Sequence, residues 1–156
     1  MASESETSIS VRLAHTLRGH TSDVNSVIFP PTQSNYPLLA SCSSDKTVRL
    51  WNLDDQSSIV LARHTYQVHW LAFSPILDDN KQFNDQYMAS VSTDGTCLLW
   101  DLTTSSVLKE YKHDSGSPIR VCQFSKDGIL LATGMFISLK VKIIVFSFVI
   151  QPVMMN

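Results

Sequence analysis

The sequence is short of the residues that mark most catalytic and ligand sites. Its 156 residues include five glycines, three cysteines and 17% charged residues, with a formal net charge of -2. It has no His-Glu-x-x-His or His-x-x-x-His pair, no glycine-rich phosphate loop, no carboxylate pair at helical spacing and no Gly-x-Ser-x-Gly elbow. It also lacks a polybasic stretch for nucleic acid or an anionic membrane surface. We therefore expect no metal, no cofactor and no catalytic residue.

Cysteine usage and the first residues indicate the cellular compartment. Cys42, Cys97 and Cys122 are odd in number, lack Cys-x-x-Cys spacing and lie in apolar, strand-like surroundings, which favours reduced thiols in the core over metal ligands or disulfides. Residues 1–8 are polar and acidic and lack the apolar segment of a secretory signal peptide. We expect these residues to be disordered and the protein to be cytoplasmic or nuclear.

The sequence does contain an internal repeat. Residues 19–52 and 63–101 carry His, Val, Phe, Ser, Asp and Trp in the same order. In both copies His to Val is four residues, Val to Phe five, Ser to Asp four and Asp to Trp six, and all of the length difference lies between Phe and Ser. The period of 44 residues from His20 to His64 is the span of a four-stranded propeller blade. The repeat therefore predicts an all-β fold.

Short apolar runs separated by turn residues predict four strands in each copy. The expected strands are 23–29, 38–43, 47–53 and 57–63, then 67–73, 87–92, 96–102 and 105–111. The dipeptide Asp94-Gly95 is typical of a tight hairpin turn. A further strand, Ile9 to Leu17, would be the fourth strand of a sheet whose other strands lie elsewhere in the sequence.

The repeated polar residues can meet at one end of such a sheet. In a four-stranded meander, the loop before strand one and the turn between strands two and three lie at the same end, so His20 and Asp45 can approach each other. A hydrogen-bonded group of Trp, His, Ser and Asp would then satisfy the buried Trp N–H, which costs about 1 to 3 kcal/mol when unpaired. Ser, His and Asp also suggest a hydrolase triad. Two copies, each with a Trp to satisfy and no oxyanion elbow, favour a structural role instead.

These motifs resemble the WD-repeat β-propeller family, whose units begin with Gly-His and end with Trp-Asp. Gly19-His20 and Trp100-Asp101 match this signature, whereas Arg63-His64 and Trp51-Asn52 each differ at one residue. The resemblance covers residues 9–134 and implies a partial propeller with two complete blades, part of a third and one orphan strand. It places repeat 1 at about 19–63, repeat 2 at about 64–112 and the start of repeat 3 at 113–134. It also implies two structural tetrads, which are His20, Ser41, Asp45 and Trp51, and His64, Ser90, Asp94 and Trp100.

The third unit begins normally and then departs from the pattern. Ile119, Phe124 and Thr133 take the places of Val, Phe and Ser, and His113 is the expected degenerate His. The positions expected for Asp and Trp hold Ile137 and Ile143. The other unassigned histidine, His69, is expected on a strand face.

The apolar tail 135–156 has three interpretations. A transmembrane helix over 135–150 would be short of the roughly 20 apolar residues that a span needs and would contain two lysines. Two edge strands of a diverged blade would suit its Ile, Val and Phe residues. The interpretation that we favour is translated intron, because Gly134-Met135-Phe136 can be encoded by GGT-ATG-TTT, which contains a GTATGT splice donor. Genomic DNA that is uninterrupted at this codon would exclude it.

A finer resemblance concerns function. His64 to Pro75, Ser90 to Asp101 and Gly116 to Gly134 resemble the opening blades of WD-repeat proteins that also carry a SAM domain and a C-terminal U-box. This resemblance implies a non-catalytic scaffold that binds other proteins within a ubiquitin ligase. A ubiquitin-conjugating enzyme would bind only through the U-box, which this chain lacks. The alternatives are a WD-repeat scaffold of an unrelated complex, a non-functional truncated product, and a membrane-tethered or enzymatic role.

The expected binding surface is the end that carries the tetrads. The loops there hold the candidate partner-binding residues, which are Ser22, Asp23, Ser44, Lys46, Tyr66, Gln67 and Thr93. Tyr66 is either an aromatic anchor for a partner or a cover for the junction between blades. The insertion Ile76 to Tyr87, at the opposite end, is expected to be a solvated loop. Because repeat arrays need closure or capping, we expect the isolated chain to be marginally stable or insoluble.

Overall fold

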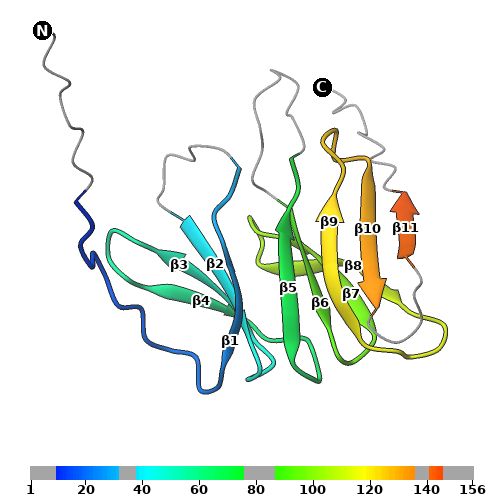
Figure 1. The fold of residues 1–156 in the computed structure, drawn as a ribbon, viewed down its shortest axis with the longest axis horizontal. Coiled ribbons are helices and arrows are strands. Elements are labelled where there is room, and N and C mark those ends of the chain that lie inside the picture. The colour runs from blue at the N-terminus through cyan, green and yellow to red at the C-terminus, as the bar shows by residue number, and fades with distance from the viewer. Residues whose placement is uncertain (1–9, 32–37, 76–86, 136–140, 146–156) are drawn as a thin grey trace, which may run out of the picture.

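A computed structural model describes residues 10–31, 38–75, 87–135 and 141–145, which form three antiparallel β-sheets and no helix (Figure 1). The sheets follow one another in chain order and do not close into a ring within these residues. The predictions for residues 1–8, the loop 76–86, Ile137 and the tail beyond residue 145 lie outside the described part. The predicted all-β class with two complete blades and part of a third is confirmed.

The first two sheets are four-stranded meanders that match the predicted strands. Sheet 1 has the order β1 (Val24–Ile28), β2 (Leu38–Ser43), β3 (Val48–Asn52) and β4 (Ser58–Leu61). Sheet 2 has the order β5 (Val68–Phe73), β6 (Tyr87–Ser92), β7 (Thr96–Asp101) and β8 (Ser106–Lys112). The turns between strands two and three are tight, and Lys46 and Gly95 take positive φ values of 75° and 78° at equivalent places. Glycine adopts this conformation without strain, whereas lysine does so at a cost.

Sheet 3 contains three described strands, β9 (Ile119–Phe124), β10 (Leu130–Met135) and β11 (Val141–Val145). The strand β11 pairs antiparallel with β10, as the edge-strand interpretation of the tail predicts. Its register corrects the sequence count by one residue. In sheets 1 and 2, the tetrad Trp pairs with the residue two places before the tetrad Ser. In sheet 3, Thr133 takes the place of that Ser, and the residue two places before it is Leu131. Leu131 pairs with Ile144. Ile144, not Ile143, therefore holds the place of the Trp, because β11 pairs with β10 one residue further along the chain than the spacing predicts.

The core lies between the sheets rather than inside any one of them. One apolar cluster joins sheet 1 to sheet 2 and includes Ala40, Leu50, Leu71 and Trp100. A second cluster joins sheet 2 to sheet 3. All three cysteines are free and buried, and burial raises the pKa of Cys42 and Cys97 to about 12. Each blade is thus stabilised mainly by its neighbours.

The segment before sheet 1 differs from its prediction. Residues 10–17 form no strand, in contrast to the orphan strand expected from Ile9 to Leu17. Val11 and Leu13 are 92% and 83% exposed. A strand needs a paired neighbour for its backbone N–H and C=O groups, and no strand of the described residues pairs with this segment.

Candidate functional site

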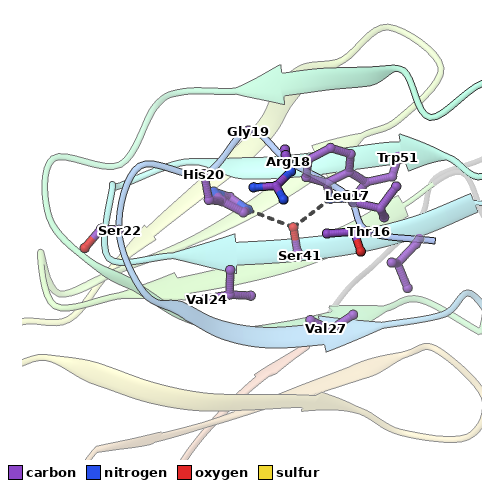
Figure 2. A pocket seen from close by; sticks show the side chains of 11 residues that line it. Thr16, Leu17, Arg18, Gly19, His20, Ser22, Val24, Val27, Ser41 and Trp51 are labelled. Carbon is purple, nitrogen blue, oxygen red and sulfur yellow. Dashed lines mark hydrogen bonds between the residues drawn. The ribbon is translucent and has the colours of Figure 1, made fainter. Parts of the chain in front are cut away.

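The first polar network links four side chains at one end of sheet 1. The His20 Nδ1 atom lies 2.8 Å from Asp45 Oδ2, and His20 Nε2 lies 2.7 Å from Ser41 Oγ. The Trp51 indole Nε1–H donates to the same Ser41 Oγ at 2.8 Å (Figure 2). The side chains of His20 and Asp45 are only 6% and 7% exposed. The structure thus brings the four predicted residues of the first repeat into one buried chain.

The second network repeats this geometry in sheet 2. His64 Nδ1 lies 3.0 Å from Asp94 Oδ2, and His64 Nε2 lies 2.7 Å from Ser90 Oγ. Trp100 Nε1–H donates to Ser90 Oγ at 2.8 Å. Ser90 has no exposed surface. The near-identical distances follow from the identical sequence spacing.

The proton positions in each network follow from the donors and acceptors. The Trp indole can only donate, so Ser Oγ accepts from it, and the Asp carboxylate can only accept, so His Nδ1 carries the proton directed at it. In the neutral imidazole tautomer with the proton on Nδ1, Nε2 is the acceptor and the Ser hydroxyl donates to it. Every polar group has a partner, but the Ser oxygen is engaged by the indole and is closed to solvent. The Ser-His-Asp arrangement in these positions is therefore a structural network rather than an attacking hydrolase triad.

Two threonines that sequence analysis missed complete the networks. Thr47 Oγ1 donates to Asp45 Oδ1 at 2.6 Å, and Thr96 makes the same bond to Asp94 at 2.5 Å. Burial alone would raise the pKa of both carboxyls, but hydrogen bonds from the nearby Thr and His groups outweigh it and hold each pKa well below its ordinary value. Both aspartates are therefore ionised at neutral pH. The Thr two residues after each Asp was the available sequence signal.

Sheet 3 contains no equivalent network among its described residues. Thr133 is buried at the Ser position, but Ile144 replaces the Trp and has no N–H to donate. His113 instead lies 2.8 Å from Ser115 Oγ through its Nδ1 atom. The described part of the third unit thus has strands of the repeat but lacks its hydrogen-bonded polar network.

The candidate partner-binding residues lie around the two networks, at the lower end of the sheets in Figure 1. Tyr66 is 60% exposed, and the Lys46 ammonium lies 5.8 Å from the centroid of its ring. The Ser92 hydroxyl donates to the Tyr66 carbonyl at 3.1 Å and so fixes the loop that carries the ring. Among the other candidates, Ser22, Asp23 and Gln67 are exposed, and Ser44 and Thr93 are partly buried.

A row of three bulged residues extends this end surface and was missed by sequence analysis. In each sheet, the second residue of the first strand is skipped by the register, and these residues are Asn25, His69 and Arg120. Asn25 donates to the Val68 carbonyl at 2.7 Å. Arg120 Nη1 lies 2.8 Å from His69 Nε2 and 3.2 Å from His69 Nδ1, and Thr93 Oγ1 lies 2.6 Å from the same Nε2. Burial and the nearby Arg120 charge lower the pKa of His69, which keeps the ring neutral at pH 7. The available sequence signal was that each of these three polar residues directly follows the Val or Ile that opens the first strand of its repeat.

A pocket of about 400 Å³ lies beside the first network. In Figure 2 the chain at Thr16 and Leu17 crosses one side of it, and Val24 and Val27 of β1 line another. The described residues contain no group of three or more His, Cys, Asp or Glu side chains that could hold a metal. The described part of the chain also contains no helix long and apolar enough to cross a membrane.

Comparison with known proteins agrees with this geometry. Residues 11–52 and 79–101 match the family model for the WD domain, G-beta repeat. The chain is also similar to human WD repeat, SAM and U-box domain-containing protein 1, with 44% identity over 59 residues. That match covers 36% of this chain and only 11% of the relative, so the chain corresponds to a small part of the relative's length. The repeat spacing and the two polar networks agree with this match, which identifies WD repeats within residues 11–52 and 79–101.

Proposed function

We propose that this protein is a non-catalytic scaffold that binds another protein at the tetrad end of its sheets. The main observation in support is the exposed Tyr66 ring. The Lys46 ammonium lies near this ring, and the Ser92 hydroxyl donates a hydrogen bond to the Tyr66 backbone carbonyl. An exposed aromatic side chain on a fixed loop buries a large area at little entropic cost, which is the character of an interface hot spot. The adjacent Arg120 and His69 add donors for the polar rim of an interface.

A finer proposal concerns the assembly to which the scaffold belongs. The name of the human relative includes a SAM domain and a U-box, and the matched segment is 44% identical. We infer that the partner is a substrate or subunit of a ubiquitylation complex, in the cytoplasm or nucleus. Any recruitment of a ubiquitin-conjugating enzyme would belong to a U-box outside this chain. Because the match spans only 11% of the relative, a scaffold in another complex is the competing assignment.

Site-specific crosslinking tests the surface. A photo-crosslinking amino acid at position 66 should capture a defined partner in cells, and the matched position 108, an exposed apolar site on β8, should not. Tyr66→Ala should weaken the affinity for that partner by about 30-fold or more, since a hot-spot truncation costs about 2 kcal/mol or more. Leu108→Ala is the control and should leave recovery unchanged.

The two levels of the proposal fail differently. Equal crosslinking at positions 66 and 108 would refute the binding surface. If the partner captured at position 66 is not ubiquitylated, or is ubiquitylated equally well in cells that lack this protein, the ligase assignment is refuted and the scaffold proposal stands.

A further inference from the structure

Each sheet uses its two faces in the same way. One face, here called the N-side face, packs on the preceding sheet, and the other, the C-side face, packs on the following sheet. The C-side face of sheet 1 meets the N-side face of sheet 2 in the first apolar cluster. The C-side face of sheet 2 meets the N-side face of sheet 3 in the second. The chain therefore contains the same type of interface twice.

The N-side face of sheet 1 has no covering sheet among the described residues. Three apolar positions on β1 are 50%, 53% and 67% exposed, and they hold Val24, Val27 and Phe29. The equivalent positions in the other two sheets are at most 7% exposed, and they hold Val68, Leu71 and Phe73, and Ile119, Cys122 and Phe124. Residues that a neighbouring sheet buries in sheets 2 and 3 are thus half exposed or more in sheet 1, where Val24 and Val27 share a pocket with the chain at Thr16 and Leu17.

The C-side face of sheet 3 is open in the complementary way. Val141 and Ile143 are 70% and 64% exposed. By register, their equivalents in sheets 1 and 2 are at most 5% exposed, and these are Val48 and Leu50, and Cys97 and Leu99. Val121, on β9 of the same face, is 48% exposed. The two ends of the described stack therefore present two different apolar faces.

The two open faces have the chemistry of the faces that already pack together inside the chain. Each C-side face carries an Ala immediately before the tetrad Ser or Thr position, which leaves room for the larger side chains of an N-side face, and these residues are Ala40, Ala89 and Ala132. Each N-side face carries a large apolar residue two places before that position, and these residues are Leu39, Met88 and Leu131. The small-to-large pattern is the same at the open ends as at the buried junctions.

We propose that the open C-side face of sheet 3 in one copy of this chain binds the open N-side face of sheet 1 in a second copy, head to tail. Such a contact joins two different surfaces, so it leaves one free face at each end and continues into oligomers. The N-side face of sheet 1 differs from that of sheet 2 mainly at Arg49, which is polar and takes the position of the buried Leu98. Its guanidinium lies 5.6 Å from the Trp51 ring centroid and its Nη1 donates to Ser58, whereas its buried Nε has no hydrogen-bond partner.

Two single charge substitutions test the proposal with the full chain. Val27→Glu blocks the N-side face of sheet 1, and Ile143→Glu blocks the C-side face of sheet 3, both at sites already more than half exposed. In sedimentation velocity, the wild type should form a concentration-dependent series of oligomers or precipitate, and each single variant should be a monomer. When the two single variants are mixed, they should form a one-to-one dimer and nothing larger. Leu108→Glu, at an exposed apolar site on β8, should associate like the wild type.

Each other outcome overturns the proposal. A dimer of either single variant alone would indicate a contact between like faces. The double variant Val27→Glu/Ile143→Glu must remain a soluble monomer with the circular dichroism of a β-sheet protein, so its precipitation would show non-specific aggregation. Folded single variants that do not pair on mixing would assign the two faces to another occupant, such as further repeats of a longer polypeptide.

Discussion

Removing the Ser90 hydroxyl should show how much a polar network stabilises one sheet. Ser90 is completely buried, and its oxygen contacts both Trp100 Nε1 and His64 Nε2. Ser90→Ala therefore leaves a buried donor and a buried acceptor without their partner. At about 1 to 3 kcal/mol for each buried polar group that loses its hydrogen bond, and with some relaxation around the small cavity, we expect a total loss of about 2 to 4 kcal/mol.

Urea unfolding followed by tryptophan fluorescence measures this loss. The association-blocked variant Val27→Glu/Ile143→Glu provides a suitable background. With a slope of about 1 to 2 kcal/mol per M, the midpoint should fall by about 1 to 4 M. Ser22→Ala, an exposed serine at the same end, is the control and should change the midpoint by less than about 0.5 M.

A double-mutant cycle separates the hydrogen bond from general packing. Trp100→Phe removes the indole N–H and keeps an aromatic ring, so Ser90→Ala should cost less in that background. We expect a coupling free energy of about 1 kcal/mol or more between the two positions. If Ser90→Ala costs no more than the Ser22→Ala control, or if the two costs simply add, the network does not stabilise the sheet as described.

The remaining predictions concern titration and thiol reactivity. Because the folded-state pKa values of Asp45 and Asp94 are lowered, their stabilisation is complete above the ordinary carboxyl pKa of about 4 and is lost as the pH falls further, so the urea midpoint should be level from pH 7 to about 5 and then decline. Asp94→Asn should make that decline shallower, and an unchanged slope would argue against the lowered pKa. Because burial raises the pKa of all three cysteines, a disulfide reagent at pH 8 should label them only as fast as the chain opens, and rapid labelling without urea would place a thiol at the surface.

The strands could be predicted from the sequence because their causes are local. Alternating apolar residues and turn residues define β1 to β8 to within a few residues, and the repeat spacing places His, Ser, Asp and Trp at equivalent points of two meanders. Counting residues along the chain gave the wrong position for the residue that replaces the Trp in sheet 3. Register is set by the pairing of β11 with β10, which a count along the sequence does not contain, so the equivalent residue is Ile144 rather than Ile143. The expected strand at residues 10–17 failed for a related reason, because a strand exists only where another strand lies beside it.

The sequence by itself determined the type of repeat, the two polar networks and the buried thiols, since these depend on spacing within one sheet. Only the tertiary structure decided which apolar residues are covered. Val27 and Leu71 hold equivalent positions in equivalent strands, yet Val27 is 53% exposed and Leu71 is 1% exposed. The difference lies in the neighbouring sheet, because burial of a blade face is a property of two sheets and not of the residues in one. Contacts between loops of different blades, such as Lys46 with Tyr66, were decided in the same way.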